Sequence, residues 1–462
     1  QNGGVLLNTL LNDLYALVSE GTKKEKGGDS LRSSGGPSQS GACIDSVAKS
    51  VAKLVVGCDA LNLMDGFVAK IVKDSKSSIS FLAYIDQIGQ LSDLGNVSDL
   101  QKRLISVLEG DEPQVLQYGA KALGGVSVGS PSSFMPLIIR EIENTNQKNV
   151  VSYLQALQIA LSSPSSFGKM QPFISDLLAG LKSLSDRIDK IPSSLVGTIL
   201  GLLAKHDASV INWIVEQIKT DSMDQVALYA SSRYIIQEKP QPEIDTAFLP
   251  HIPVFFITPL SSPNNLIAKT ALESLKVVCH TNTAFLLPSL HSLISVLYDA
   301  TKRKNVKEYV FGASLHIEDD EESNRLLAYE CLDSLLPACA GRVNMSDYVL
   351  RVSEGLQDMY HVKLKCHSLL CRLATSHAVD AVVAHTDHIV DGLWLTISKE
   401  LPKNESQREV DKQEEMVRGA LRSITVLEGI PHAAHNPKMK KVLADILASK
   451  FKNEVEFVLS FS

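Results

Sequence analysis

The chain has 462 residues, of which 44% are hydrophobic and 21% charged, and its formal net charge is −7. This length and hydrophobic content allow a large buried core. The lack of a basic excess and an aromatic content of only 6% argue against nucleic acid as the main ligand, because phosphate contacts and base stacking need both.

The seven cysteines are an odd number and lack the dense spacing of a disulfide framework, so we expect a reducing compartment. The most apolar segment, residues 248–260, is interrupted by Pro250, Pro253 and Pro259. We therefore expect no membrane-spanning helix, and we expect no secretory signal peptide.

The first part of the chain changes character near residue 20. Leucines at helical spacing predict an amphipathic helix over residues 5–19, which we interpret as a partial leading helix of residues 1–20. Residues 21–41 are rich in Gly, Ser and Lys and predict a flexible loop.

From Ala42 onward, helix follows helix. Asp111 is predicted to cap a helix with Pro113 in its first turn, and other prolines mark helix starts. These starts are Pro131, Pro192, Pro242 and Pro263.

One pattern recurs in many helices: a small or short residue is followed by apolar ones, as in Ala122, Leu123 and Val126. The matches are often about 40 residues apart, a spacing that is typical of HEAT and armadillo helix pairs. Such a unit is stable only when stacked on its neighbours. The sequence thus predicts an all-α fold, a curved right-handed HEAT-repeat α-solenoid of about ten or eleven helix pairs. Second helices of these pairs are expected over residues 134–142 and 285–297.

Residues 298–322 interrupt this pattern. Two β-prone runs, Val306 to Phe311 and Ser314 to Ile317, flank Gly312 and Ala313 and predict a protruding β-hairpin, although a disordered loop fits the spacing equally. Five acids, Glu318 to Glu322, follow and are interpreted as a solvated helix entry rather than a cation site. HEAT repeats are expected over residues 42–297, and further repeats with a cap over residues 323–462.

No constellation of residues predicts catalysis, and we expect neither a cofactor nor a metal. Gly125, Ser127 and Gly129 have the spacing of a hydrolase nucleophile elbow, but no strand precedes them, so an interhelical turn is favoured. His377, His385 and His388 lack the cysteines or the HExxH arrangement of a metal site and are interpreted as structural. Cys366, His367 and Cys371 share one helix and lack further ligands.

The last third of the sequence contains runs that carry a family resemblance. They are Tyr298-Asp299 through Asp319-Asp320, Ala328-Tyr329-Glu330-Cys331-Leu332-Asp333-Ser334-Leu335-Leu336, Glu354-Gly355-Leu356-Gln357-Asp358-Met359-Tyr360-His361-Val362-Lys363, Cys366-His367, and Lys412-Gln413-Glu414-Glu415-Met416-Val417-Arg418-Gly419-Ala420-Leu421-Arg422-Ser423. In this order they resemble the C-terminal region of the cullin-associated, neddylation-dissociated protein family, also described as TATA-binding-protein-interacting proteins.

The resemblance implies a non-enzymatic assembly and exchange factor for cullin-RING ubiquitin ligases, present in cytoplasm and nucleus. It would hold the N-terminal end of an unmodified cullin with its RING subunit, and its hairpin would compete with the substrate-receptor adaptor. The partner-binding residues implied are Lys304, Lys307, Tyr309, Val310, Phe311, Leu315 and Ile317.

Two alternatives remain open from the sequence. The chain is either a fragment or one half of a split protein completed by a separate N-terminal HEAT chain, because the resemblance covers about the C-terminal third of the family's solenoid and the sequence starts at Gln1. The other possible function is that of an importin-like transport or assembly scaffold that binds a peptide or a small GTPase.

Overall fold

The computed structural model describes residues 39–144, 148–184, 191–236, 241–311, 314–339, 341–375, 378–401, 406–449 and 451. The expected helix of residues 5–19 and nearly all of the expected loop of residues 21–41 lie outside these ranges. Within them the chain is helical apart from one two-stranded sheet, so the predicted all-α HEAT-repeat class is confirmed. The chain divides into two compact units, residues 1–235 and 236–462.

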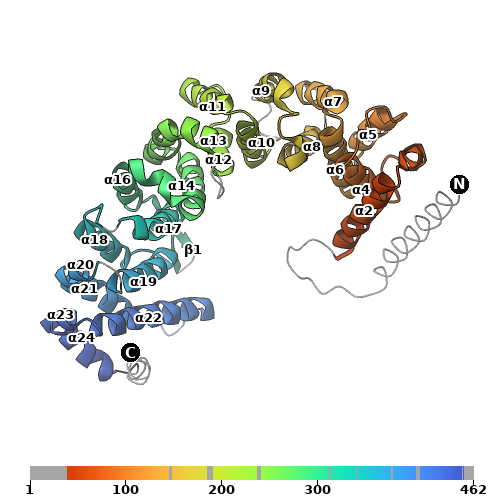
Figure 1. Ribbon diagram of the computed structural model, residues 1–462. Coiled ribbons are helices and arrows are strands. Elements are labelled where there is room, and N and C mark those ends of the chain that lie inside the picture. Colours follow the sequence, from red (N-terminus) through yellow and green to blue (C-terminus); the bar gives the residue numbers. More distant parts are fainter. Residues whose placement is uncertain are drawn as a thin grey trace. The chain divides into compact units, whose positions relative to one another are not determined.

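The first unit is a stack of antiparallel helix pairs in two layers (Figure 1). The first layer consists of α2 (Gln39–Gly57), α4 (Ser78–Gly89), α6 (Pro113–Gly129), α8 (Val150–Ser162), α10 (Ser193–His206) and α12 (Gln225–Ile235). The second layer consists of α3 (Met64–Ala69), α5 (Leu100–Leu108), α7 (Pro131–Glu143), α9 (Ile174–Ser183) and α11 (Ser209–Thr220). Each first-layer helix packs on the next, which buries the apolar stripe that a single pair leaves open.

Small residues set the close approach of α4 and α6. A Cβ atom on Gly125 would lie 2.3 Å from the carbonyl oxygen of Asp86, and one on Gly129 would lie 2.2 Å from that of Ser92. Ser127 is buried between these glycines, and its hydroxyl donates to the carbonyl of Leu123 at 2.7 Å. The expected interhelical turn is therefore wrong, because this motif forms the last turns of α6 and serves helix packing.

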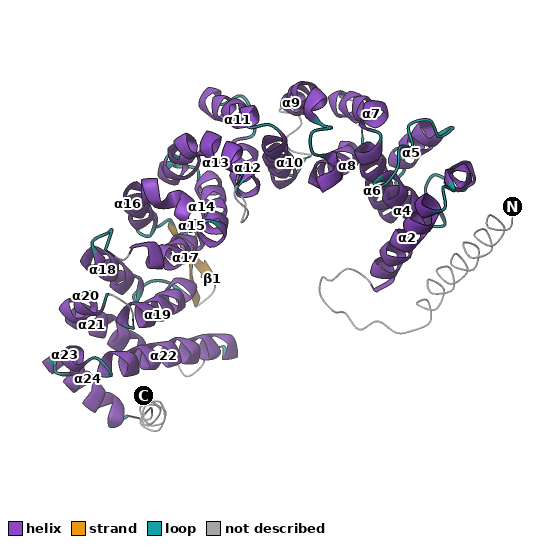
Figure 2. Ribbon diagram, viewed as in Figure 1, coloured by secondary structure: helices purple, strands orange, loops and turns teal. Residues whose placement is uncertain are grey.

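The second unit repeats the layered arrangement (Figure 2). Its first layer consists of α14 (Asn265–Thr281), α17 (Glu322–Cys339), α19 (Tyr360–Ala374) and α22 (Gln407–Glu428). Its other helices are α13 (Pro242–Phe248), α15 (Thr283–Leu286), α16 (Leu290–Ala300), α18 (Met345–Gly355), α20 (Val379–Ala384), α21 (Thr386–Ile397), α23 (Pro431–Ala434) and α24 (Pro437–Leu447). The strands β1 (Val306–Phe311) and β2 (Ser314–Asp319) lie between α16 and α17.

Several helix ends differ from the sequence-based expectation. The expected helix of residues 285–297 is broken into α15, a 3-10 turn over Leu287–Ser289 and α16, because Pro288 has no N–H to continue an α-helix. The helix expected at Pro263 starts at Asn265, where the side chain of Asn264 accepts from the amide of Leu266 at 3.0 Å.

The expected cap at Asp111 is also wrong. Glu112 occupies the N-cap position of α6 without a side-chain hydrogen bond. Instead, the backbone amides of Asp111 and Glu112 donate to the Asp74 carboxylate at 2.7 and 3.0 Å. The start of α6 is thus held by the preceding repeat rather than by its own residues.

Among the described residues, no single helix is long and apolar enough to cross a bilayer. One pair, Pro242–His251 and Pro253–Ser261, reaches the required length and hydropathy together but bends by 56° at its break.

Candidate functional site: the hairpin and its root

The hairpin between α16 and α17 is an antiparallel ribbon with a regular register from Val306↔Asp319 to Phe311↔Ser314. The predicted hairpin is confirmed, and the first strand has the expected ends. The second strand runs two residues further, to Asp319 instead of Ile317. This extension brings an aspartate from the acidic run into the sheet.

The predicted partner-binding residues all lie on or next to this ribbon. Lys304, Lys307 and Tyr309 are exposed, and Tyr309 keeps 42% of its surface in contact with solvent. Backbone pairing places Val310 opposite Leu315, Phe311 opposite Ser314 and Ile317 opposite Glu308. The side chains of Val310, Phe311, Leu315 and Ile317 lie outside the described part of the structure, so their contact role stays a prediction.

The register divides these positions between two faces, because neighbouring residues of a strand alternate. Positions 306, 308, 310, 315, 317 and 319 share one face, and positions 307, 309, 311, 314, 316 and 318 share the other. Val306, 49% exposed, and Tyr309, 42% exposed, belong to opposite faces. Solvent therefore reaches described apolar side chains on both faces of the ribbon.

The root of the hairpin is built around Asp319, the last residue of β2. One carboxylate oxygen accepts from the backbone amides of Asn305 at 2.9 Å and Glu321 at 3.1 Å. The other oxygen lies 2.7 Å from the Arg325 guanidinium. Asp319 thus joins Asn305, the residue before β1, to Glu321, two residues after β2, and to helix α17.

Arg325 connects this root to the next repeat. Its side chain is fully buried and donates to both oxygens of Asp358, through Nε at 2.8 Å and Nη2 at 2.6 Å. Nη1 also donates to the backbone carbonyl of Arg303 at 2.8 Å. Asp358 lies two residues before α19, so a single guanidinium ties together the hairpin, α17 and the start of α19.

A second set of contacts fixes the other side of the root. Arg303 donates to Glu321 at 3.0 Å and to the carbonyl of Leu260 at 3.1 Å. Asn265, the first residue of α14, donates to the carbonyl of Asp320 at 2.8 Å. The root therefore rests on the preceding repeat as well as the following one.

The ionisation of the root follows from these contacts. Burial disfavours the Asp319 carboxylate, but the amides of Asn305 and Glu321 and the Arg325 guanidinium outweigh it, so the pKa of Asp319 is below its ordinary value. Burial likewise disfavours charged Arg325, but Asp358 and Asp319 outweigh it and raise the pKa of Arg325. Both groups therefore stay ionised inside the protein at neutral pH.

The interpretation of Glu318 to Glu322 as a solvated helix entry is wrong for Asp319 and Glu321, whereas Glu318 is exposed. Asp319 and Glu321 are buried, Glu318 and Asp319 belong to β2, and α17 begins only at Glu322. Glu321 and Asp319 can be buried because Arg303 and Arg325, respectively, neutralise them. The sequence does contain a signal for this, since Arg325 occupies the same helical stripe as Ala328, Tyr329 and Leu332.

The other candidate residues do not form a site. His385 shares a hydrogen bond of 2.7 Å with the Ser346 hydroxyl, which agrees with a structural role, whereas His377 lies outside the described residues. No group of three metal-ligating side chains occurs in the described ranges. The cysteines in these ranges are free thiols, and burial raises the pKa of Cys366 and Cys371.

Comparisons with known proteins agree with the resemblance seen in the sequence. Residues 285–447, which include the hairpin and its root, match the TATA-binding protein interacting (TIP20) family. "Cullin-associated NEDD8-dissociated protein 1" of Drosophila melanogaster is 27% identical over 470 residues, covering 98% of this chain and 37% of that protein. "Cullin-associated NEDD8-dissociated protein 1, C-terminal part" of Emericella nidulans is 20% identical and covers 66% of this chain.

Solved structures show the same fold at low sequence identity. Yeast importin-β (Kap95p) superposes with a TM-score of 0.57 at 10% identity, covering 95% of this chain and 55% of its own. Kap95 in a complex with Nup1 gives a TM-score of 0.58 at 12% identity, covering 96% of this chain and 56% of its own. This likeness concerns the HEAT-repeat fold alone.

The chain spans about a third of the length of the curated relatives it matches, with 37% for the Drosophila protein and 35% for the Arabidopsis thaliana protein. Residues 285–447 thus match the TATA-binding protein interacting family, and the chain is similar over most of its length to cullin-associated NEDD8-dissociated proteins at 25–27% identity.

Proposed function

We propose that this chain is a non-enzymatic cullin-binding assembly and exchange factor for cullin-RING ubiquitin ligases. The names of its relatives associate them with cullins. In this proposal the second unit holds the N-terminal end of an unmodified cullin that carries its RING subunit. The hairpin occupies the surface that the substrate-receptor adaptor would otherwise bind.

The observation that carries the proposal is the bracing of the hairpin root by Asp319, Arg325 and Asp358. A two-stranded ribbon alone is marginally stable in water and exposes unpaired backbone groups. Because buried ion pairs tie the root of this ribbon to α17 and to the start of α19, its direction is set before a partner arrives. Pre-organisation lowers the entropy cost of binding and suits an element that must compete for a pocket.

Competition follows from overlapping sites on one scaffold. If the hairpin and the adaptor need the same surface of the cullin, each weakens the binding of the other by the same factor. A transient ternary complex then has a faster adaptor off-rate than the binary complex. No covalent step is required. Among the described side chains, Lys304, Lys307 and Tyr309 are the ones proposed to contact the partner.

Two further parts of the proposal concern an additional partner and the location of the protein. This chain covers 37% of the Drosophila protein, and we propose that the remaining repeats belong either to a longer form of this protein or to a separate N-terminal HEAT chain that acts as an additional partner. We propose that the chain is located in the cytoplasm and the nucleus, because it would have to encounter cullin ligases in these compartments.

The experiment uses the whole chain and a purified, unmodified cullin with its RING subunit, with and without bound adaptor. A matched variant replaces residues 307–317 by a short Gly-Ser turn and keeps Asn305, Asp319 and Arg325. We expect both proteins to retain cullin and only the wild type to displace the adaptor efficiently.

Two results would contradict parts of this proposal separately. Equal adaptor release by wild type and variant would show that the hairpin does not compete. Failure of the wild type to retain cullin would remove the proposed function itself, provided that circular dichroism shows a folded protein.

A further inference from the structure

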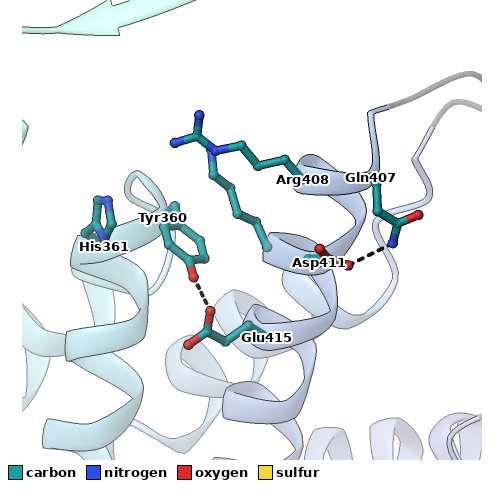
Figure 3. Close-up of a pocket in the computed structure, with 7 residues that line it drawn as sticks. Tyr360, His361, Gln407, Arg408, Asp411 and Glu415 are labelled. Atoms are coloured by element: carbon teal, nitrogen blue, oxygen red, sulfur yellow. Dashed lines mark hydrogen bonds between the residues drawn. The ribbon is translucent and has the colours of Figure 1, made fainter. Parts of the chain in front are cut away.

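A pocket of about 500 Å³ opens between the first turns of α19 and α22 (Figure 3). Tyr360 and His361 line it from α19, and Gln407, Arg408 and Asp411 line it from α22. Most of its side chains are polar or charged. The pocket therefore offers charged groups of both signs to a partner.

The acidic groups of this pocket already have partners inside the chain. The Tyr360 hydroxyl donates to Glu415, and the Gln407 amide donates to Asp411 at 2.8 Å. The pKa of Tyr360 is raised, chiefly by its hydrogen bond to Glu415, so the phenol keeps this proton at neutral pH. Each acid thus accepts a hydrogen bond from a neutral side chain of the pocket.

The cations are not engaged equally. Lys412 lies 2.7 Å from Glu409, and its Nζ is 5.7 Å from the centre of the Tyr360 ring. Arg408, in contrast, forms no hydrogen bond or ion pair with any residue that the structure describes. Figure 3 shows its guanidinium extending from α22 toward the side of α19 where Tyr360 and His361 lie. The planar N–H donors of the Arg408 guanidinium, at the mouth of the pocket, are therefore available to a ligand.

The pocket and the hairpin are held by the same buried ion pairs. Asp358 precedes Tyr360 by two residues and receives both hydrogen bonds from Arg325, which also binds Asp319 at the end of β2. The wall of the pocket on α19 is therefore fixed relative to the hairpin root. A protein that lies against the hairpin has this pocket within the same repeat region.

We propose that the pocket is a subsite for an aspartate or glutamate side chain of the protein that the hairpin engages. This inference rests on the proposed function. The guanidinium of Arg408 receives the carboxylate, since its planar fork matches two carboxylate oxygens. The ring of His361, which packs edge-on against Tyr360 at 4.8 Å, borders the same mouth. The subsite adds a charge-specific contact to those of the hairpin and selects partners with an acid at this position.

The test measures the affinity of the whole chain for the unmodified cullin and its RING subunit at several salt concentrations. Arg408→Glu should weaken binding by about tenfold to a hundredfold, the range for losing a hydrogen-bonded charge pair. Arg408→Lys should fall between this variant and the wild type, because an ammonium lacks the planar fork.

Arg418→Glu is the matched control, because Arg418 is an exposed arginine of the same helix that pairs with Glu414 at 3.0 Å and does not line the pocket. It should leave the affinity within about threefold of the wild type. Equal losses for the two variants would overturn the subsite and leave the proposed function standing, whereas absent binding by the wild type would count against that function.

A second part of the experiment distinguishes a carboxylate ligand of the pocket from a phosphate ligand. Treating the partner with phosphatase should leave the wild-type affinity unchanged. A loss of affinity that removes the difference between wild type and Arg408→Glu would assign the pocket to a phosphorylated residue and contradict the carboxylate proposal.

Discussion

Arg325 and Asp358 form a bidentate ion pair across 33 residues of sequence, with exposures of 0% and 7% for the two side chains. Arg325 also binds Asp319, so one cation stands between two buried carboxylates. Such a group is expensive to desolvate and is stable only when its partners remain in place. The hairpin is therefore coupled to the repeat that follows it.

Arg325→Met tests this coupling. The substitution leaves Asp319 and Asp358 buried without their cation, which should destabilise the second unit by about 3–5 kcal/mol. Denaturant unfolding followed by circular dichroism measures the loss, and hydrogen exchange of the β1 and β2 amides should quicken at the same time.

The control for this substitution is Lys276→Met. Lys276 pairs with Glu330 at 2.7 Å between α14 and α17, but both side chains are partly exposed, so a change of about 0–1 kcal/mol is expected. If Arg325→Met cost no more than Lys276→Met, the hairpin root would not depend on its buried ion pairs.

A buried histidine predicts a particular loss of stability in acid. His367 is 2% exposed, and neither ring nitrogen has a hydrogen-bond partner among the described residues. Burial, with a smaller contribution from Lys363, lowers the pKa of His367 from 6.5 to about 3. Between these values the unfolded chain binds a proton that the folded chain does not, so stability is full above pH ~6.5 and falls as pH drops toward ~3.

His367→Leu should remove this contribution. The free energy of unfolding of the wild type should fall by about 1.4 kcal/mol more per pH unit than that of the variant within this window. At pH 7 the variant should be no less stable, because the buried nitrogens lack partners. Parallel stability profiles for the two proteins would contradict the assigned ionisation of His367.

The packing of α4 on α6 predicts opposite effects for two glycine substitutions. Gly125→Ala would place a Cβ 2.3 Å from the Asp86 carbonyl oxygen and should destabilise the first unit by about 1–3 kcal/mol. Gly66→Ala in α3 meets nothing within 4 Å and should stabilise by up to about 1 kcal/mol through helix propensity. Thermal unfolding of both variants checks the prediction, and similar shifts for the two would show that α4 and α6 do not touch at Gly125.

Local sequence patterns account for much of the fold. Pro131 and Pro242 start α7 and α13 as expected, and Val306 to Phe311 forms the expected strand, because these signals depend on residues close in sequence. Val310, Phe311, Leu315 and Ile317 could be placed on the ribbon by the same reasoning. Their role in binding depends on a partner and stays a prediction.

The root of the hairpin could not be predicted in the same way. Local charge density made Glu318 to Glu322 look like a solvated helix entry, whereas the burial of Asp319 and Glu321 depends on Arg325 and Arg303. The pairing of Arg325 with Asp358 joins residues in different repeats, and spacing carries no information about such contacts. The pocket at Tyr360 and Arg408 is likewise formed by two helices that meet only after the repeats stack.

The rate at which the adaptor leaves an unmodified cullin tests the central claim most directly. A fluorescently labelled adaptor bound to the cullin is mixed with an excess of this chain, and its dissociation is followed in time. We predict that the wild type accelerates dissociation and that the variant with residues 307–317 replaced by a Gly-Ser turn binds cullin but accelerates it far less. An adaptor off-rate that is the same with wild type, with the variant and with no added chain would contradict the account.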